Sequence, residues 1–301
     1  MRGGCHNLFD KIRNALKKPE QLLPVSRAQV SRPERHQPPQ PRQSLPPPVV
    51  EPFTGTAAET AAPEIRPPDM FRGNIDHSGH LRLLARNDVD AAKLCLDAMT
   101  GSRQRLTVKY DAATEVSGYL TGESMLDLMT ITKSGDTVAA YPVFKAGSPW
   151  PARISRTTER ENGFEGQIEV FADGGTLSFF DAMYFRNKNT YAPGRDVRVL
   201  MGGIAYVLAR SRGGATAEDG MIVRHEDGDI DDHVFQGTAL DVYEFMALGR
   251  KAWVIKTSLR LGHDSPPREF YICATTSALQ EKISPGDRIS GIIWLQGFVL
   301  P

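Results

Sequence analysis

The sequence contains one phrase twice: residues 193–208 read PGRDVRVLMGGIAYVL, and residues 285–300 read PGDRISGIIWLQGFVL. Each copy begins with a Pro-Gly pair, which is typical of a tight turn, and continues as a β-rich run that contains glycines. Each copy also closes a segment with the alternation and turn residues of β-hairpins. The repeat therefore predicts a mainly β protein with two similar modules in tandem.

The segments upstream of the two copies give the expected module boundaries. We expect the first β module, a meander followed by a hairpin array, at residues 103–210, an acidic, glycine-containing linker at residues 211–232, and the second module at residues 233–301. Each hairpin array has three strands, a short connection and a long final strand, and internal glycines let such strands bend into a small closed sheet. This order predicts small OB-like barrels, which have five strands. Only four clear strands are visible in each module, so SH3-like or irregular barrels remain open.

The chain before residue 103 has a different character. Residues 1–70 contain 13 of the 21 prolines, and residues 21–74 are predicted to be a disordered, proline-rich linker. Apolar residues at helical spacing predict a helical segment at residues 75–102. At the N-terminus, residues 1–20 are a candidate docking helix, because Leu8, Phe9, Ile12 and Leu16 fall on one side of a short helix.

The charge of the chain is unevenly distributed. Residues 1–50 contain nine Lys and Arg against three Asp and Glu, which is a net charge of +6. The remainder, 27 basic and 33 acidic residues, has a net charge of −6. A basic arm on a mildly acidic body is typical of a tail that contacts nucleic acid, a membrane surface or an acidic partner. Peripheral membrane contact through residues 7–18 is one such possibility.

Cysteine use and hydropathy indicate a cytoplasmic protein. Cys5, Cys95 and Cys273 are isolated from one another and form no pair with metal-ligand or redox spacing. Cys273 is expected to be a small buried residue of a strand. No run of residues reaches the roughly 20 apolar positions that a membrane-spanning helix needs.

The sequence shows no recognisable catalytic, cofactor or metal motif. Residues 225–233, HEDGDIDDH, form its densest group of possible metal ligands, but the spacing of a calcium-binding loop is not met. Phosphate-binding glycine loops and nucleophile elbows do not occur. We therefore expect no catalytic, cofactor-binding or metal-binding residues, and an enzyme with an unrecognised site is the weakest of three functional alternatives.

Aromatic and basic residues near the modules are the better candidates for function. The candidate binding surface is Tyr184, Phe185, Arg186, Lys188, Arg250 and Lys251. Because the body is mildly acidic, we expect a non-enzymatic binding or adaptor protein that engages a macromolecular partner, most simply a protein. The alternative is a single-stranded nucleic-acid-binding protein, since OB-like barrels stack bases on exposed rings and pair phosphates with nearby cations.

Overall fold

The fold is mainly β, as the sequence predicts. The computed structural model describes residues 78–85, 90–91, 93–95, 97, 104–111, 114–120, 124–134, 136–211 and 220–300. The predicted docking helix, with Leu8, Phe9, Ile12 and Leu16, and the predicted proline-rich linker lie outside these residues. Within the predicted helical segment, the 3-10 helix η1 occupies Ser78–Leu83, and the described residues between 90 and 97 are helical.

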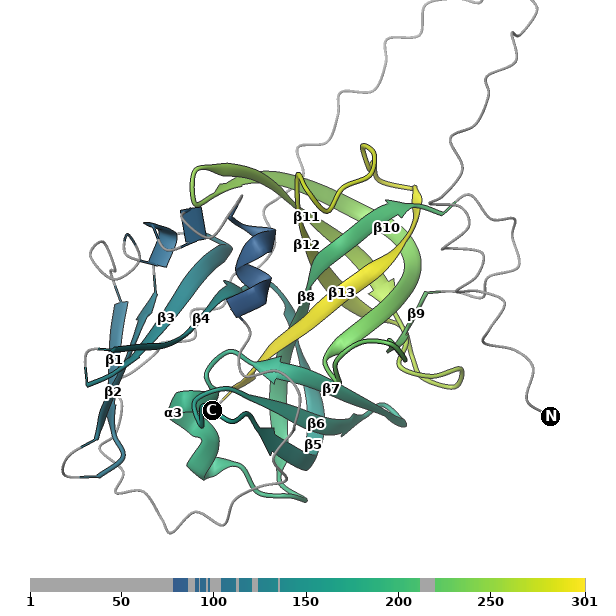
Figure 1. Cartoon of the computed structure of the whole chain (residues 1–301). Helices are drawn as coiled ribbons and strands as arrows, with labels where there is room; N and C mark the ends of the chain where they lie inside the picture. Colours follow the sequence, from purple (N-terminus) through teal and green to yellow (C-terminus); the bar gives the residue numbers. More distant parts are fainter. Residues whose placement is uncertain are drawn as a thin grey trace, which may run out of the picture. The chain divides into compact units, whose positions relative to one another are not determined.

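A four-stranded antiparallel meander follows, in the order β1-β2-β3-β4 (Figure 1). Its strands are β1 (Gln104–Lys109), β2 (Glu115–Leu120), β3 (Leu126–Lys133) and β4 (Asp136–Phe144). Lys145 and Asp127 form a buried ion pair beside this meander. Their side chains are each only 1% exposed, and Lys145 Nζ lies 2.8 Å from Asp127 Oδ2. This pair joins the start of β3 to the residue after β4.

The remaining strands form a nine-stranded sheet. They are β5 (Ser148–Glu159), β6 (Gly166–Ala172), β7 (Gly175–Asp181), β8 (Asp196–Arg210), β9 (Met221–Arg224), β10 (Asp232–Ala247), β11 (Arg250–Leu259), β12 (Arg268–Thr275) and β13 (Arg288–Leu300). Between β7 and β8 lie α3 (Tyr184–Asn187) and η2 (Lys188–Thr190). β9 lies inside the segment predicted to be a linker.

The strand pairings trace two closed circuits of five strands each. The first circuit runs β5-β6-β7-β13-β8 and returns to β5; the second runs β10-β11-β12-β8-β13 and returns to β10. In both circuits the third strand pairs in parallel with a strand from the other half of the chain: β7 with β13, and β12 with β8. The first circuit therefore takes β5, β6, β7 and β8 from one half of the chain and β13 from the other. The second takes β10, β11, β12 and β13 from one half and β8 from the other.

The two circuits share β8 and β13, which correspond to the repeated phrase. These strands pair antiparallel from Arg198 with Leu300 to Arg210 with Ile289. Figure 1 shows β13, in yellow, running from the group of β10, β11 and β12 to the group of β5, β6 and β7. The expectation of two barrels that each close on their own is not confirmed, because the fifth strand of each circuit comes from the other half of the chain.

The Pro-Gly turns bind the bent first strand of each circuit in the same way. Gly194 and Gly286 have φ of 85° and 91°, which suits the third position of a type II turn that follows proline. In the first circuit, the Gly194 amide donates to the Ile154 carbonyl, and the Ile154 amide donates to the Arg195 carbonyl. In the second, Gly286, Ala239 and Asp287 make the matching pair of hydrogen bonds. The repeated phrase thus reflects a repeated hydrogen-bonded junction.

Each junction also lies next to a β-bulge. The register of β5 shifts between Ile154 and Arg156, and that of β10 shifts between Ala239 and Asp241. A bulge bends its strand and lets one strand serve two neighbours. β5 accordingly pairs with β8 through its first half and with β6 through its second, while β10 pairs with β13 and then with β11.

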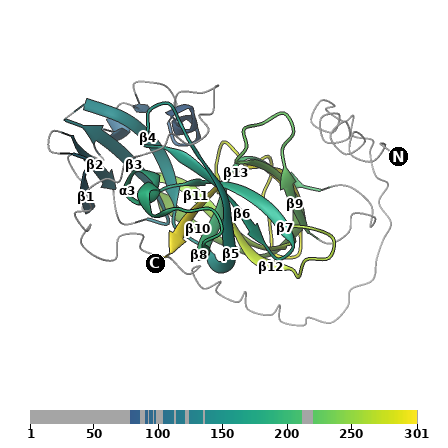
Figure 2. The same cartoon turned by 90° about the horizontal axis from the view of Figure 1, so that it is seen from below.

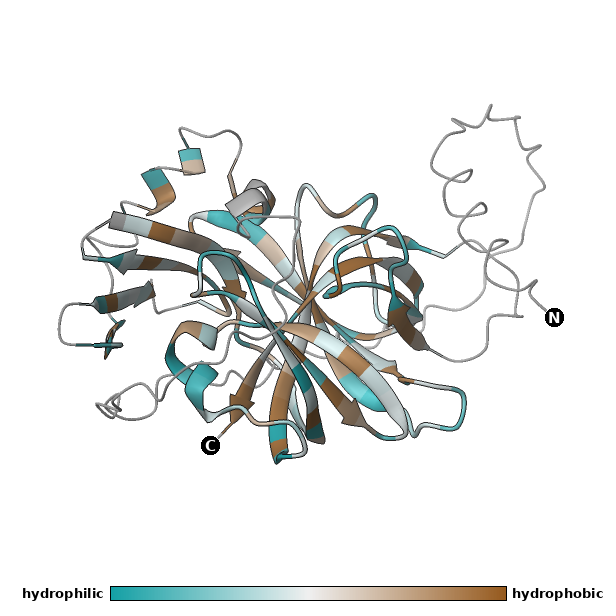
Figure 3. Ribbon diagram, turned by 60° about the horizontal axis from the view of Figure 1, so that its bottom comes forward, coloured by the Kyte–Doolittle hydropathy of each residue, from teal (hydrophilic) through white to brown (hydrophobic). Residues whose placement is uncertain are grey.

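Alternation along the strands separates two main cores. One core lines the circuits and contains Trp150, Ile168, Val199, Phe270 and Ile293, among other buried apolar residues. The other lies where the meander packs on the nine-stranded sheet, and Tyr141, Phe144, Phe180, Trp294 and Phe298 belong to it. Figure 2 shows the meander on one side of the strands of the circuits. In Figure 3 the hydrophobic residues concentrate on the strands and the hydrophilic ones on the connecting loops.

Glycines allow the shared strands to approach their neighbours closely. A Cβ atom at Gly203 would lie 2.6 Å from Ile293 Cδ1, and one at Gly297 would lie 2.8 Å from the backbone oxygen of Leu200. A Cβ atom at Gly291 would overlap the backbone oxygen of Val207. Since a backbone atom of a paired strand cannot move aside as a side chain does, Gly291 is required by the β8–β13 pairing.

We expect Gly291→Ala to lower the free energy of unfolding by about 1–3 kcal/mol, which is typical of overpacking a closely packed site. Urea denaturation followed by circular dichroism measures this change. Gly262→Ala is the matched control, because its nearest non-neighbouring atom, Ser265 Oγ, is 3.5 Å from the added Cβ. Equal stability of the two variants would contradict the role assigned to Gly291.

Candidate binding site

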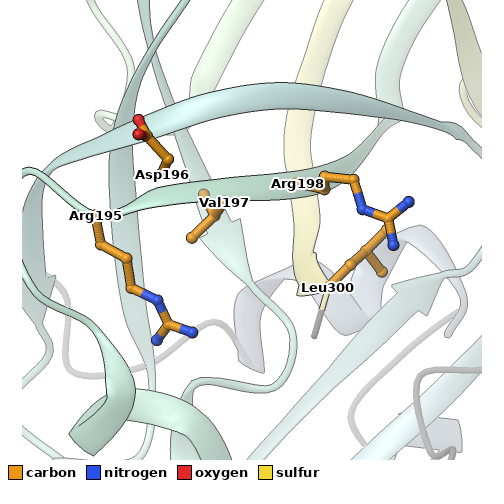
Figure 4. Close-up of a pocket in the computed structure, with 5 residues that line it drawn as sticks. All are labelled: Arg195, Asp196, Val197, Arg198 and Leu300. Carbon is orange, nitrogen blue, oxygen red and sulfur yellow. The ribbon is translucent and has the colours of Figure 1, made fainter.

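The outer surface of the first circuit carries a cationic and partly apolar face. Because side chains alternate along a strand, Ala152, Ile154 and Val199 point into the core, while their neighbours point outward. One outward row crosses β8, β5 and β6 as Asp196, Arg153 and Phe171. A second row crosses β13, β8 and β5 as Leu300, Arg198 and Pro151. These six residues are called the Arg–Phe face, and Arg195, in the Pro-Gly turn before β8, leaves the backbone on the other side from Asp196 (Figure 4).

A hollow of about 320 Å³ lies at one end of this face. It is lined by Arg195, Asp196, Val197, Arg198 and Leu300 (Figure 4). Figure 4 shows the Arg198 guanidinium beside the Leu300 side chain, at the end of β13. Arg195, Asp196 and Arg198 are all exposed, so the hollow is an open depression and not an enclosed pocket. The antiparallel register of β8 and β13 places Arg198 opposite Leu300 and thereby forms the hollow.

The three arginines near the hollow, Arg153, Arg195 and Arg198, differ in their partners. Arg153 Nε donates to Asp196 Oδ1 at 2.8 Å, and this bond lowers the pKa of Asp196. Arg195 donates to the Thr190 carbonyl at 2.6 Å. Within the part of the chain that the structure describes, no hydrogen bond or ion pair engages the Arg198 guanidinium. Two arginines against one aspartate give the Arg–Phe face a net charge of +1, and the Arg153–Asp196 pair leaves this charge on Arg198.

Phe171 is the aromatic member of the face. Its side chain is 51% exposed, and it lies near the end of β6, between Arg153 of β5 and Thr176 of β7 and next to the β6–β7 turn. A large apolar ring at an outward position adds nothing to either core. The face therefore combines an accessible ring with cations, an arrangement that suits binding of an anionic ligand with flat or apolar parts.

The predicted binding residues did not include Arg153, Phe171, Arg195 or Arg198. The alternation of residues 152–157 and 166–172 could have indicated their outward positions. Arg153 and Phe171 fall at the positions that alternate with the small and apolar residues of these two segments. What the sequence lacks is the order of the strands. Only the pairing of β5 with both β6 and β8 brings Phe171 and Arg198 onto one surface.

The prediction that Tyr184 and Phe185 are exposed is wrong. Both belong to α3, and their exposed fractions are 3% and 1%. The Tyr184 ring lies over Gly166, and the Phe185 ring lies over Gly118, where a Cβ atom would come within 2.5 Å of either ring. These two glycines make room for the rings, so α3 is anchored to the sheet by the aromatic residues that the sequence suggested for binding.

The basic residues of the same segment are also committed to the fold. Lys188 Nζ donates to Glu159 Oε2 at 2.8 Å and to the Gly163 carbonyl at 2.7 Å. The Lys188 and Glu159 side chains are 9% and 13% exposed. Arg186 is half-buried. Lys188 therefore holds η2 against the β5–β6 hairpin and is not available as a surface cation.

Arg250 and Lys251 lie at the start of β11, outside the Arg–Phe face. In the sheet, β12 lies between β11 and β8. Arg250 is half-buried and pairs with Asp90. Lys251 is exposed, pairs with Glu244 at 2.8 Å, and lies 5.4 Å from the centroid of the Trp253 ring. Their role in binding remains a prediction, and both cations have acidic partners within the chain.

The acidic segment at residues 225–233 forms an internal connection. Arg160 donates to Asp229 Oδ2 at 2.9 Å, and Trp294 Nε1 donates to Asp231 Oδ2 at 3.1 Å. Tyr206 donates to Asp232 Oδ1 at 2.8 Å. Among the described residues, no group of three His, Cys, Asp or Glu side chains is arranged to hold a metal ion. The carboxylates instead connect the start of β10 and the residues before it to Arg160 after β5, to Tyr206 of β8 and to Trp294 of β13.

Asp181 is a buried carboxyl group at the end of β7. It accepts a hydrogen bond from the Tyr191 hydroxyl and one from the Met183 amide at 3.1 Å. Burial raises the pKa of Asp181 to about 7, and these hydrogen bonds oppose the rise only in part. Asp181 lies opposite Gly297 in the β7–β13 pairing and is fully buried. The ionisation of Asp181 therefore bears on the stability of the fold beside β13.

Comparisons with known proteins provide no family. No protein-family model matches the chain, and no curated protein matches it. One solved structure found is the cytoplasmic molybdate-binding protein ModG with molybdate bound, at 15% identity and a TM-score of 0.28, covering 51% of this chain and 96% of that one. A TM-score this low assigns neither a fold nor a ligand to this chain.

Among the described residues, none of the helices is long and apolar enough to span a bilayer.

We expect Asp181→Asn to remove part of the pH dependence of stability. The folded state favours neutral Asp181, so this group stabilises the fold below about pH 4, and its contribution is lost as the pH rises through about 7. Asparagine mimics the neutral acid and should raise the free energy of unfolding near pH 8, by at most about 4 kcal/mol. Urea denaturation at about pH 5 and pH 8 measures the effect.

Asp196→Asn serves as the control. The pKa of Asp196 is lowered by the hydrogen bond from Arg153, so this carboxyl group stays ionised across the same window. The pH dependence of its variant should match the wild type between pH 5 and pH 8. An Asp181→Asn protein with the wild-type pH dependence would show that Asp181 does not titrate in this range.

Proposed function

We propose that this chain is a non-enzymatic binding protein that holds a macromolecular partner with negative charge against the Arg–Phe face. In this proposal the two circuits are OB-like barrels that brace each other through β8 and β13. The observation that carries it is Arg198, an exposed guanidinium without a partner among the described residues, beside an open hollow and an apolar Leu300.

The charge distribution supports a partner with negative charge. The chain beyond residue 50 has a net charge of −6, yet the Arg–Phe face has a net charge of +1, and Arg195 lines the hollow beside it. A cationic patch on an acidic body steers an anionic partner to one place, because the remaining surface repels it. The basic residues 1–50 would add attraction to the same class of partner.

The shape of the site supports a macromolecule over a small molecule. Small-molecule sites are concave and enclose most of their ligand. The hollow here is open, and most of its lining residues lie on β8 and β13. The outward side chains of the neighbouring strands β5 and β6 continue this surface to Phe171. An extended partner can contact the hollow, Arg153 and the ring at the same time.

Heparin, a linear polyanion, is a suitable first probe of this face. We expect Arg198→Glu in the full chain to bind immobilised heparin about tenfold more weakly at fixed salt, because a hydrogen bond to a charged group contributes about 1.5 kcal/mol or more. Retention at several salt concentrations measures the change. Circular dichroism verifies that the variant is folded.

Arg105→Glu is the matched control, since Arg105 is 55% exposed on β1 of the meander. It changes the net charge by the same amount outside the Arg–Phe face and should bind heparin nearly as the wild type does. Equal weakening by both substitutions would show that heparin responds only to net charge, and the proposed site would then be wrong.

A further inference from the structure

We infer that the partner of the Arg–Phe face is a single-stranded nucleic acid, whose bases stack on Phe171 and whose phosphates pair with Arg198 and with Arg195 at the hollow. This inference rests on the proposed function and specifies its ligand. It follows from the placement of the ring relative to the cations, from the surroundings of the ring and from the continuity of the two outward rows.

The ring and the cations lie along one path across the sheet. From Leu300 on β13 the path passes Arg198 on β8, continues over β5 with Pro151 and Arg153, and ends at Phe171 on β6. Three steps between neighbouring strands span about 14 Å, and two residues along a strand add about 7 Å. This length accommodates several nucleotides of a single strand, the scale on which OB-type surfaces bind.

The surroundings of Phe171 favour a base over a protein side chain. Protein interfaces bury an apolar core that is depleted of charged residues. Phe171 instead has Arg153 on one neighbouring strand and Thr176 on the other, so no apolar core surrounds it. A base needs only the flat face of the ring. An acidic peptide would use the arginines but leave the ring without a partner.

The geometry of the cations also fits a nucleic-acid backbone. Arg195 and Arg198 line the same hollow, and Figure 4 shows Arg195 before the start of β8, pointing away from Asp196, and the Arg198 guanidinium beside Leu300. Planar guanidinium groups bind phosphate oxygens through paired hydrogen bonds. Leu300 gives the hollow an apolar floor, on which a sugar or base can rest.

Fluorescence anisotropy with a labelled oligothymidine of about 15 nucleotides tests the inference, since such a strand covers the site sizes of OB-type surfaces. The full chain is titrated at several salt concentrations. Phe171→Ala should raise the Kd by about fivefold or more, because stacking contributes about 1–3 kcal/mol per base, and it should leave the salt dependence unchanged. Arg198→Ala should raise the Kd and reduce the slope of log K against log salt by about 0.7.

Met246→Ala is the matched control for the loss of an exposed apolar side chain. Met246 is 61% exposed on β10, outside the Arg–Phe face, so its variant should bind as the wild type does. A duplex of the same sequence, which offers no unpaired base to the ring, should bind more weakly than the single strand and respond little to Phe171→Ala.

Three outcomes would overturn the inference: no binding of the oligonucleotide at low salt, binding that Phe171→Ala does not weaken, or a preference for the duplex. If heparin still distinguishes Arg198→Glu from Arg105→Glu, the proposed anion-binding face stands and its partner is an acidic protein. If heparin does not distinguish them either, the proposed function fails together with the inference.

Discussion

The antiparallel pairing of β8 with β13 is the interaction on which the rest of the structure depends. These two long strands close both circuits. Each also pairs in parallel with a strand from the other half of the chain: β8 with β12, and β13 with β7. Their close approach requires residues without a Cβ atom, and Gly203, Gly291 and Gly297 occupy the tightest positions. Neither half of the chain has the strands to close alone, so we expect the two halves to fold as one cooperative unit.

The same pairing creates the candidate binding site. Arg198 and Leu300 are about a hundred residues apart in the chain, yet they are opposite each other in the β8–β13 register. The first strand of the circuit, β5, bends at its bulge and joins this pair to Phe171 of β6. A surface with the Phe171 ring at one end and Arg198 at the other is thus a product of strand order.

Much of the secondary structure was predictable because the signals are local. The Pro-Gly turns, the Asn162-Gly163 turn and the alternating strands depend on residues that lie next to one another. The burial of Cys273 followed from its apolar strand. The roles of Tyr184 and Phe185 were not predictable, because the glycines that receive their rings, Gly166 and Gly118, lie on other strands. Each circuit takes four strands from one half of the chain, β5 to β8 or β10 to β13, and the sequence did not show where its fifth strand comes from.

The sequence by itself determined that the chain is mainly β, where its hairpins turn, and that its two halves end in the same phrase, since backbone propensity and turn chemistry act over a few residues. Only the tertiary structure decided that the two final strands pair with each other, which aromatic residues are core and which ring stays exposed. The physical reason is that strand pairing and burial depend on contacts between distant segments, and those contacts exist only when the whole sheet has formed.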